Sequence, residues 1–120
     1  MITRKNELRS DKHEAFRGGK GTVQMDHFLD QATVNGAGRL FAKSIVPPGA
    51  SVGYHKHEGD NETYYILSGK ALINDNGTEV EMGPGDCHFC PDGHSHGIEN
   101  IGDEDLIYIA LILFTKQKTE

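Results

Sequence analysis

A chain of 120 residues, 36% of them hydrophobic and 25% charged, can bury one hydrophobic core, so we expect a single domain. Its formal net charge of −6 makes nucleic acid a poor partner, because binding to phosphates depends on Lys and Arg. No stretch approaches the roughly 20 apolar residues of a membrane span, and the first residues lack the apolar segment of a signal peptide. We therefore expect a protein of the cytoplasm with no membrane partner.

The elements predicted along the chain are almost all strands. Residues 1–37 form a polar N-terminal arm, irregular or partly helical up to residue 20, in which 22–29 could add a strand to the sheet or to a dimer interface. Apolar and alternating segments bounded by turn residues then predict eight further strands. These strands are expected at residues 39–46, 51–57, 62–67, 70–74, 78–82, 87–90, 96–100 and 105–114.

Turn signals separate these strands at short intervals. The sequence Pro47-Pro48-Gly49 interrupts strand pairing because proline supplies no N–H donor, and Asp75-Asn76-Gly77 is typical of a hairpin turn. Short strands at this spacing, in a chain with 15 glycines, indicate an all-β sandwich or a closed barrel. We expect this all-β body to span residues 38–115 and to be followed by a polar C-terminal tail at 116–120.

Five of the seven histidines lie between positions 55 and 96. His55 and His57 are two apart on a predicted strand, so their side chains share one face. Two neighbouring imidazoles repel each other when protonated, and a cation bound to both neutral rings removes that conflict. Glu62 follows a short loop and would add an anionic ligand, and His96 could complete the set. Three imidazoles and one carboxylate suit Mn, Fe, Co, Ni, Cu or Zn.

Two strings of residues carry a fixed spacing that includes these four positions. The first is Gly49-x5-His55-x-His57-x4-Glu62-x6-Gly69. The second is Gly85-x5-Pro91-x-Gly93-x2-His96-x3-Asn100. At every fixed position they match the two signatures of the cupin superfamily, and the 15 residues between them resemble the spacer of compact single-domain cupins. The sequence therefore resembles a small cupin over about residues 38–115.

The resemblance implies both a fold and a ligand set. The fold is a double-stranded β-helix, also called a jelly-roll barrel. The implied metal ligands are His55, His57, Glu62 and His96, and all four are present. We therefore expect one divalent transition metal ion, from among Mn, Fe, Zn and Ni, and a small-molecule ligand at the open positions of the ion.

Similar cupins include oxygenases, decarboxylases and isomerases, so we favour a metal-dependent enzyme acting on a small oxygen-rich molecule such as a carboxylate or a sugar. The alternative is a non-catalytic module that binds a small molecule or the metal alone. His94 and Tyr64 are the expected general acid or base residues. In many small cupins an N-terminal segment pairs with a neighbouring subunit, so we also expect a homodimer.

Other polar residues receive less specific expectations. His13 and His27 have no partner nearby in the sequence, and we expect both to be solvated. Asp60 and Asn61 precede Glu62 and could orient a ligand, but a solvated loop is the favoured interpretation. Lys43 shares a face with Phe41 and Ile45, and we expect it to point into water.

Overall fold

The computed structural model describes residues 1–116, and its regular elements are almost all strands. Within these residues no helix is long and apolar enough to cross a membrane. The elements in chain order are η1 (Lys5–Glu7), β1 (Arg9–Glu14), η2 (Phe16–Gly18), β2 (Thr22–Leu29), β3 (Gly38–Val46), β4 (Ser51–Lys56), β5 (Asp60–Ser68), β6 (Ala71–Asp75), β7 (Thr78–Met82), β8 (Cys87–Cys90), β9 (Ser95–Asn100) and β10 (Leu106–Phe114). The predicted tail falls outside the described residues beyond residue 116.

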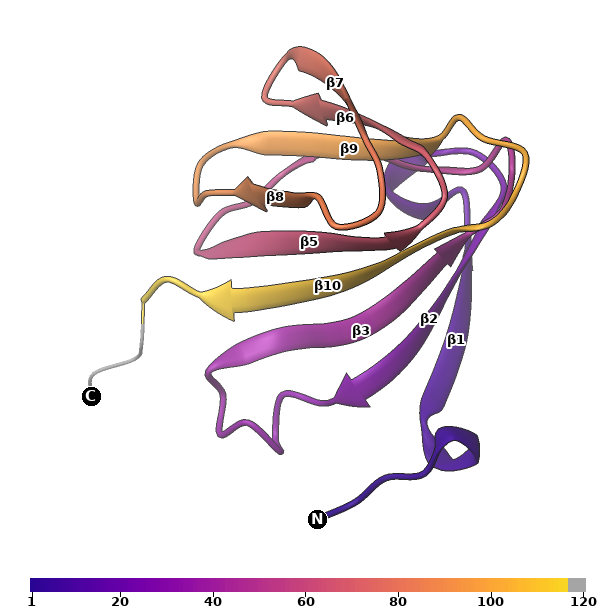
Figure 1. Cartoon of the computed structure of the whole chain (residues 1–120). Helices are drawn as coiled ribbons and strands as arrows, with labels where there is room; N and C mark the ends of the chain where they lie inside the picture. Colours follow the sequence, from indigo (N-terminus) through magenta and orange to yellow (C-terminus); the bar gives the residue numbers. More distant parts are fainter. Residues whose placement is uncertain (117–120) are drawn as a thin grey trace.

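The strands form two antiparallel sheets that face each other. The larger sheet has six strands in the order β1-β2-β3-β10-β5-β8, and the smaller has four in the order β4-β9-β6-β7. Figure 1 shows the four-stranded sheet lying over the β5 and β8 end of the larger sheet, with β1 and β2 at the opposite end. This arrangement confirms the predicted all-β jelly-roll barrel.

Strand alternation builds the core between the sheets. On β10 the residues Leu106, Tyr108, Ala110 and Ile112 are buried, and the residues between them are more exposed. Equivalent buried residues from the smaller sheet include Val52, Ile73 and Ile98. Each large apolar side chain that is fully buried contributes about 1.5–3 kcal/mol. The core therefore holds the two sheets at a fixed separation and fixes the walls of the interior.

The N-terminal arm is more regular than the sequence indicated. Residues 9–14 form strand β1, which pairs with β2 so that Arg9 lies opposite His27 and His13 lies opposite Val23. The expectation of an irregular or partly helical segment up to residue 20 was wrong for this part. The sequence Arg-Ser-Asp-Lys-His-Glu carries no apolar alternation, because the inward-facing positions of β1 line a polar cavity and not the apolar core.

Two β-bulges redirect side chains along the inner wall. Between β3 and β10 the pairing passes from Leu40–Ile112 to Gly38–Leu113, so Arg39 has no partner residue. Between β4 and β9 it passes from Val52–Ile98 to His55–His96. A bulge lets consecutive residues escape strict alternation and re-aims a side chain. The two bulges allow Arg39 and His55 to face the interior.

The segment after β1 is anchored to the smaller sheet. The Lys20 N–H donates to the Ser51 hydroxyl at 3.0 Å, and the Ser51 N–H donates to the Lys20 carbonyl at 2.9 Å. A Cβ atom at Gly53 would collide with the Arg17 carbonyl oxygen, so only glycine permits this close approach. The N-terminal arm therefore packs directly beside the strand that carries His55.

Candidate metal centre

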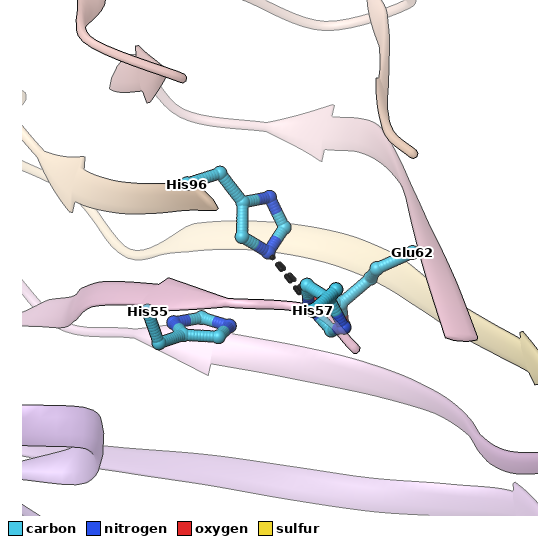
Figure 2. Close-up of side chains that lie close together, drawn as sticks. All are labelled: His55, His57, Glu62 and His96. Carbon is cyan, nitrogen blue, oxygen red and sulfur yellow. Dashed lines mark hydrogen bonds and ion pairs between the residues drawn. The ribbon is translucent and has the colours of Figure 1, made fainter. Parts of the chain in front are cut away.

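The structure brings the four predicted ligands together. His55 on β4 and His96 on β9 are directly opposite each other in the ladder, His57 follows the end of β4, and Glu62 lies on β5. One ligand atom from each residue lies within 4.8 Å of all the others. Figure 2 shows the three imidazoles and the carboxylate pointing toward one point between the sheets.

The spacing of three of these ligand atoms matches a shared ion. His57 Nε2 lies 3.1 Å from Glu62 Oε1 and 3.1 Å from His96 Nε2, and His96 Nε2 lies 3.0 Å from Glu62 Oε1. Two ligands bound at about 2.1 Å and at right angles to each other lie about 3.0 Å apart. The three atoms could therefore occupy neighbouring positions around one transition metal ion without moving far.

The second ring nitrogen of each histidine has its own partner. His55 Nδ1 donates to the Gly53 carbonyl at 2.7 Å, and His57 Nδ1 donates to Asp60 Oδ1 at 2.6 Å. His96 Nδ1 lies 3.1 Å from His88 Nε2, which can accept its proton. A proton on Nδ1 leaves the Nε2 lone pair free, which is the tautomer that a metal ligand needs. All three Nε2 atoms face the cluster.

Burial and neighbouring charges set the protonation of the cluster. Burial lowers the pKa of His55 from 6.5 to about 4. Burial alone would raise the pKa of Glu62, but hydrogen bonds with His57 and His96 outweigh it and hold the pKa at about 2. Burial alone would lower the pKa of His57, but hydrogen bonds with Glu62 and Asp60 raise it above its usual value. At neutral pH the site thus offers an ionised carboxylate and a neutral His55.

Asp60 corrects one expectation from the sequence. Its side chain is 7% exposed and is not part of a solvated loop. One carboxylate oxygen accepts from His57 Nδ1 at 2.6 Å and the other accepts from Arg39 Nε at 2.8 Å. The alternative considered for this residue, orienting a ligand, is the one that the structure supports. A hydrogen-bonded carboxylate behind a ligating histidine fixes the ring and makes it more basic.

The two predicted acid or base residues lie in different surroundings. Tyr64 is buried, stacks on His96 at a ring distance of 4.9 Å, and places its hydroxyl 3.5 Å from His96 Nε2. Burial raises the pKa of Tyr64 well above 10, so the phenol stays protonated. His94 is exposed and does not line the cavity that contains the cluster. The structure therefore brings Tyr64, but not His94, to the four ligands.

Three of the four clustered residues, His55, His57 and Glu62, line a cavity of about 200 Å³. The N-terminal arm closes the other side of this cavity with Asp11 and His13 from β1 and His27 from β2. Both imidazoles contact the Asp11 carboxylate, at 3.0 Å from His13 and 3.1 Å from His27. The expectation that His13 and His27 are solvated was wrong. Asp11 is two residues from His13 on β1, and the pairing of β1 with β2 brings His27 to the same carboxylate.

Outside the cavity, the predicted outward direction of Lys43 is confirmed. Its ammonium group lies 3.8 Å from Asp26 and does not line the interior. Lys43 therefore plays no part in the charge of the site.

A comparison with protein-family models decides the family. The cupin domain model matches residues 42–112, which are more than half of the chain and include all four clustered residues. The chain belongs to the cupin family.

This cupin is similar to several known proteins in sequence and in fold. It is 45% identical over 113 residues to a protein of Thermotoga maritima named oxalate-binding protein, covering 94% of this chain and 93% of the relative. A crystal structure described as a predicted oxalate decarboxylase from Thermotoga maritima superposes with a TM-score of 0.91 at 45% identity, covering 95% of this cupin and 99% of that chain. The dimethylsulfoniopropionate lyase DddQ of Ruegeria pomeroyi is 29% identical over 107 residues, which span 82% of this cupin and 51% of the lyase.

Proposed function

We propose that this cupin binds one divalent transition metal ion through His55, His57, Glu62 and His96. The observation that supports the proposal most strongly is the direction of the three Nε2 atoms. Without a metal ion, the buried Nε2 atoms of His57 and His96 lie 3.1 Å apart beside the Glu62 carboxylate, and only protons placed on them can hydrogen-bond that carboxylate. With a cation, the same arrangement is a complete set of protein ligands. Mn, Fe, Zn and Ni all accept such ligands.

The protein ligands occupy four positions, so an octahedral ion would keep two positions open toward the cavity. A bound metal of this kind polarises an oxygen atom of a ligand or activates water. The buried phenol of Tyr64 can donate a hydrogen bond to a molecule held there, because its high pKa keeps the proton in place. The relative named oxalate-binding protein suggests a small carboxylate, and we propose oxalate as the first compound to test.

We favour a metal-dependent enzyme of the oxygenase, decarboxylase or isomerase type, with Tyr64 as the residue best placed to act on a bound molecule. The relative named as a lyase supports a catalytic role. The alternative is a non-catalytic binding module, which the name of the oxalate-binding relative supports. His94 remains a predicted acid or base residue, although its side chain is exposed and is not among the residues that line the cavity.

One experiment separates the enzyme from the binder. Protein loaded with Mn²⁺ is incubated with oxalate and a panel of small acids and sugars, and product formation and O₂ uptake are followed. We expect turnover in wild type, none in His96→Ala, and at least a tenfold reduction in Tyr64→Phe with the metal content unchanged. Metal-loaded protein that binds oxalate but converts no compound in the panel would favour the binding module.

Two further expectations stay predictions, namely the homodimer and the cytoplasmic location. The side chains of Tyr65 on β5 and Phe89 on β8 are exposed at 45% and 52%, which supports an interface on that face of the larger sheet.

A further inference from the structure

The cavity differs in charge from the rest of the molecule. The whole chain has a formal net charge of −6, yet three of its four arginines, Arg9, Arg17 and Arg39, line the cavity. Among residues 1–116 no lysine lines it, and the only carboxylates in the lining are Asp11 and Glu62. The lining therefore carries more positive than negative charge even before a divalent ion is added. An acidic protein with a cationic cavity attracts small anions to that cavity.

Arg39 is the most firmly fixed of the three arginines. The bulge on β3 turns it inward, and its Nε donates to the buried carboxylate of Asp60 at 2.8 Å. Within residues 1–116 its two terminal nitrogens have no hydrogen-bond partner, and its side chain is 35% exposed. Arg9, by contrast, is paired with Asp11 at 2.6 Å and is 62% exposed. Arg39 thus lines the cavity with two terminal nitrogens left over for a ligand, and a guanidinium is the group that pairs best with a carboxylate.

The position of Arg39 relative to the metal cluster limits the size of its partner. One carboxylate, that of Asp60, joins the Arg39 guanidinium to the His57 ring, at 2.8 Å on one side and 2.6 Å on the other. The guanidinium is therefore linked to the cluster through one carboxylate and one imidazole ring, and it lines the same cavity as His55, His57 and Glu62. A molecule that reaches both the ion and Arg39 within a cavity of about 200 Å³ must be small.

The two halves of the cavity come from different parts of the chain. The metal cluster lies within residues 42–112, the segment that the cupin domain model matches. Arg9, Arg17 and Arg39, together with Asp11, His13 and His27, precede that segment. Ligand selection can therefore vary with the N-terminal residues while the metal ligands stay the same.

From these observations we propose that Arg39 is the specificity-determining residue of the site and that it selects short acids with two anionic groups. One group is held at the metal ion and the second at the terminal nitrogens of Arg39. The inference rests on the proposed metal site and adds the class of ligand to it. Short dicarboxylates fit this description, whereas neutral sugars and monocarboxylic acids lack the group that Arg39 binds.

The test uses pairs of ligands that differ only in the second charge. Oxalate, malonate and succinate are compared with their monoamides by calorimetry on Mn²⁺-loaded protein, after metal content has been measured. For the diacid that binds best to the wild type, we expect a dissociation constant about tenfold to a hundredfold lower than that of its monoamide. This ratio corresponds to the free energy that a charge-assisted hydrogen-bonded pair usually contributes. Arg39→Gln should reduce that ratio to about one and keep the metal content.

Two control variants make the result specific to Arg39. Arg4→Gln removes the one arginine outside the cavity and should keep the full preference. Arg39→Lys keeps the positive charge, but an ammonium group cannot bond Asp60 and the ligand together as a guanidinium does. We therefore expect this variant to keep part of the preference for the diacid. It also provides the test if Arg39→Gln fails to fold. A wild type that binds diacid and monoamide equally, or binds neither, would overturn the proposal. Absence of metal uptake would instead refute the metal site and would be seen before any ligand is added.

Discussion

Replacing Asp60 by Asn should weaken metal binding although Asp60 is not itself a ligand. The carboxylate accepts one hydrogen bond from His57 at 2.6 Å and another from Arg39 at 2.8 Å. An amide offers one oxygen and one NH₂ group, so one of the two donors must lose its acceptor. The ring of His57 then loses its fixed orientation and the charge that makes it basic. Removal of such a partner typically costs 10-fold to 100-fold in metal affinity, which is about 1.4–2.7 kcal/mol.

The affinity is measured at neutral pH by competition with a chromophoric chelator. Asp92→Asn is the matched control, because Asp92 is an exposed carboxylate of a nearby loop that bonds Gly59 and Thr115 and touches no ligand. Far-ultraviolet circular dichroism checks that both variants fold. An Asp60→Asn protein that keeps the wild-type dissociation constant, or a control that loses as much affinity, would refute the role given to Asp60.

Three further predictions concern the metal, pH and assembly. Protein treated with a chelator should melt about 10 °C below protein that contains metal at about a hundred times its dissociation constant, as measured by calorimetry. Equal melting temperatures would mean that no ion binds the folded state. The pKa of Glu62 is held at about 2, against 4.5 for an ordinary Glu, so the metal-free protein should lose stability as pH falls from 4.5 toward 2. In urea titrations, the free energy of unfolding of Glu62→Gln should depend less on pH over that range. Sedimentation should give a dimer mass for wild type and a monomer mass for Phe89→Glu, and a monomeric wild type at micromolar concentration would contradict the dimer.

The fold and the four ligands could be predicted because their signals are local. Glycine and proline turns, apolar alternation and the spacing from Gly49 to Asn100 each depend on neighbouring residues. The strand carrying His55 and the strand carrying His96 pair directly, so a motif read along the chain also identifies neighbours in space. Even the inward direction of His55 follows from the motif, although the bulge behind it breaks simple alternation.

The rest of the cavity could not be predicted because it depends on long-range pairing. Strand β1 is polar at every position, so hydropathy gives no sign that Asp11 reaches His27. Arg39 shares its alternation phase with the outward-facing Lys43, and only the bulge opposite Ile112 and Leu113 turns it inward. Asp60 could be named as a possible partner of a ligand, but its burial depends on Arg39 from another strand.

X-ray absorption of the bound metal tests the central claim most directly. Protein reconstituted with Mn²⁺ should contain about one ion per chain, with imidazole scattering from three histidines that falls to two in His55→Ala. Protein that takes up no transition metal, or whose spectrum shows no imidazole and does not change in His55→Ala, would contradict a metal centre at this cluster.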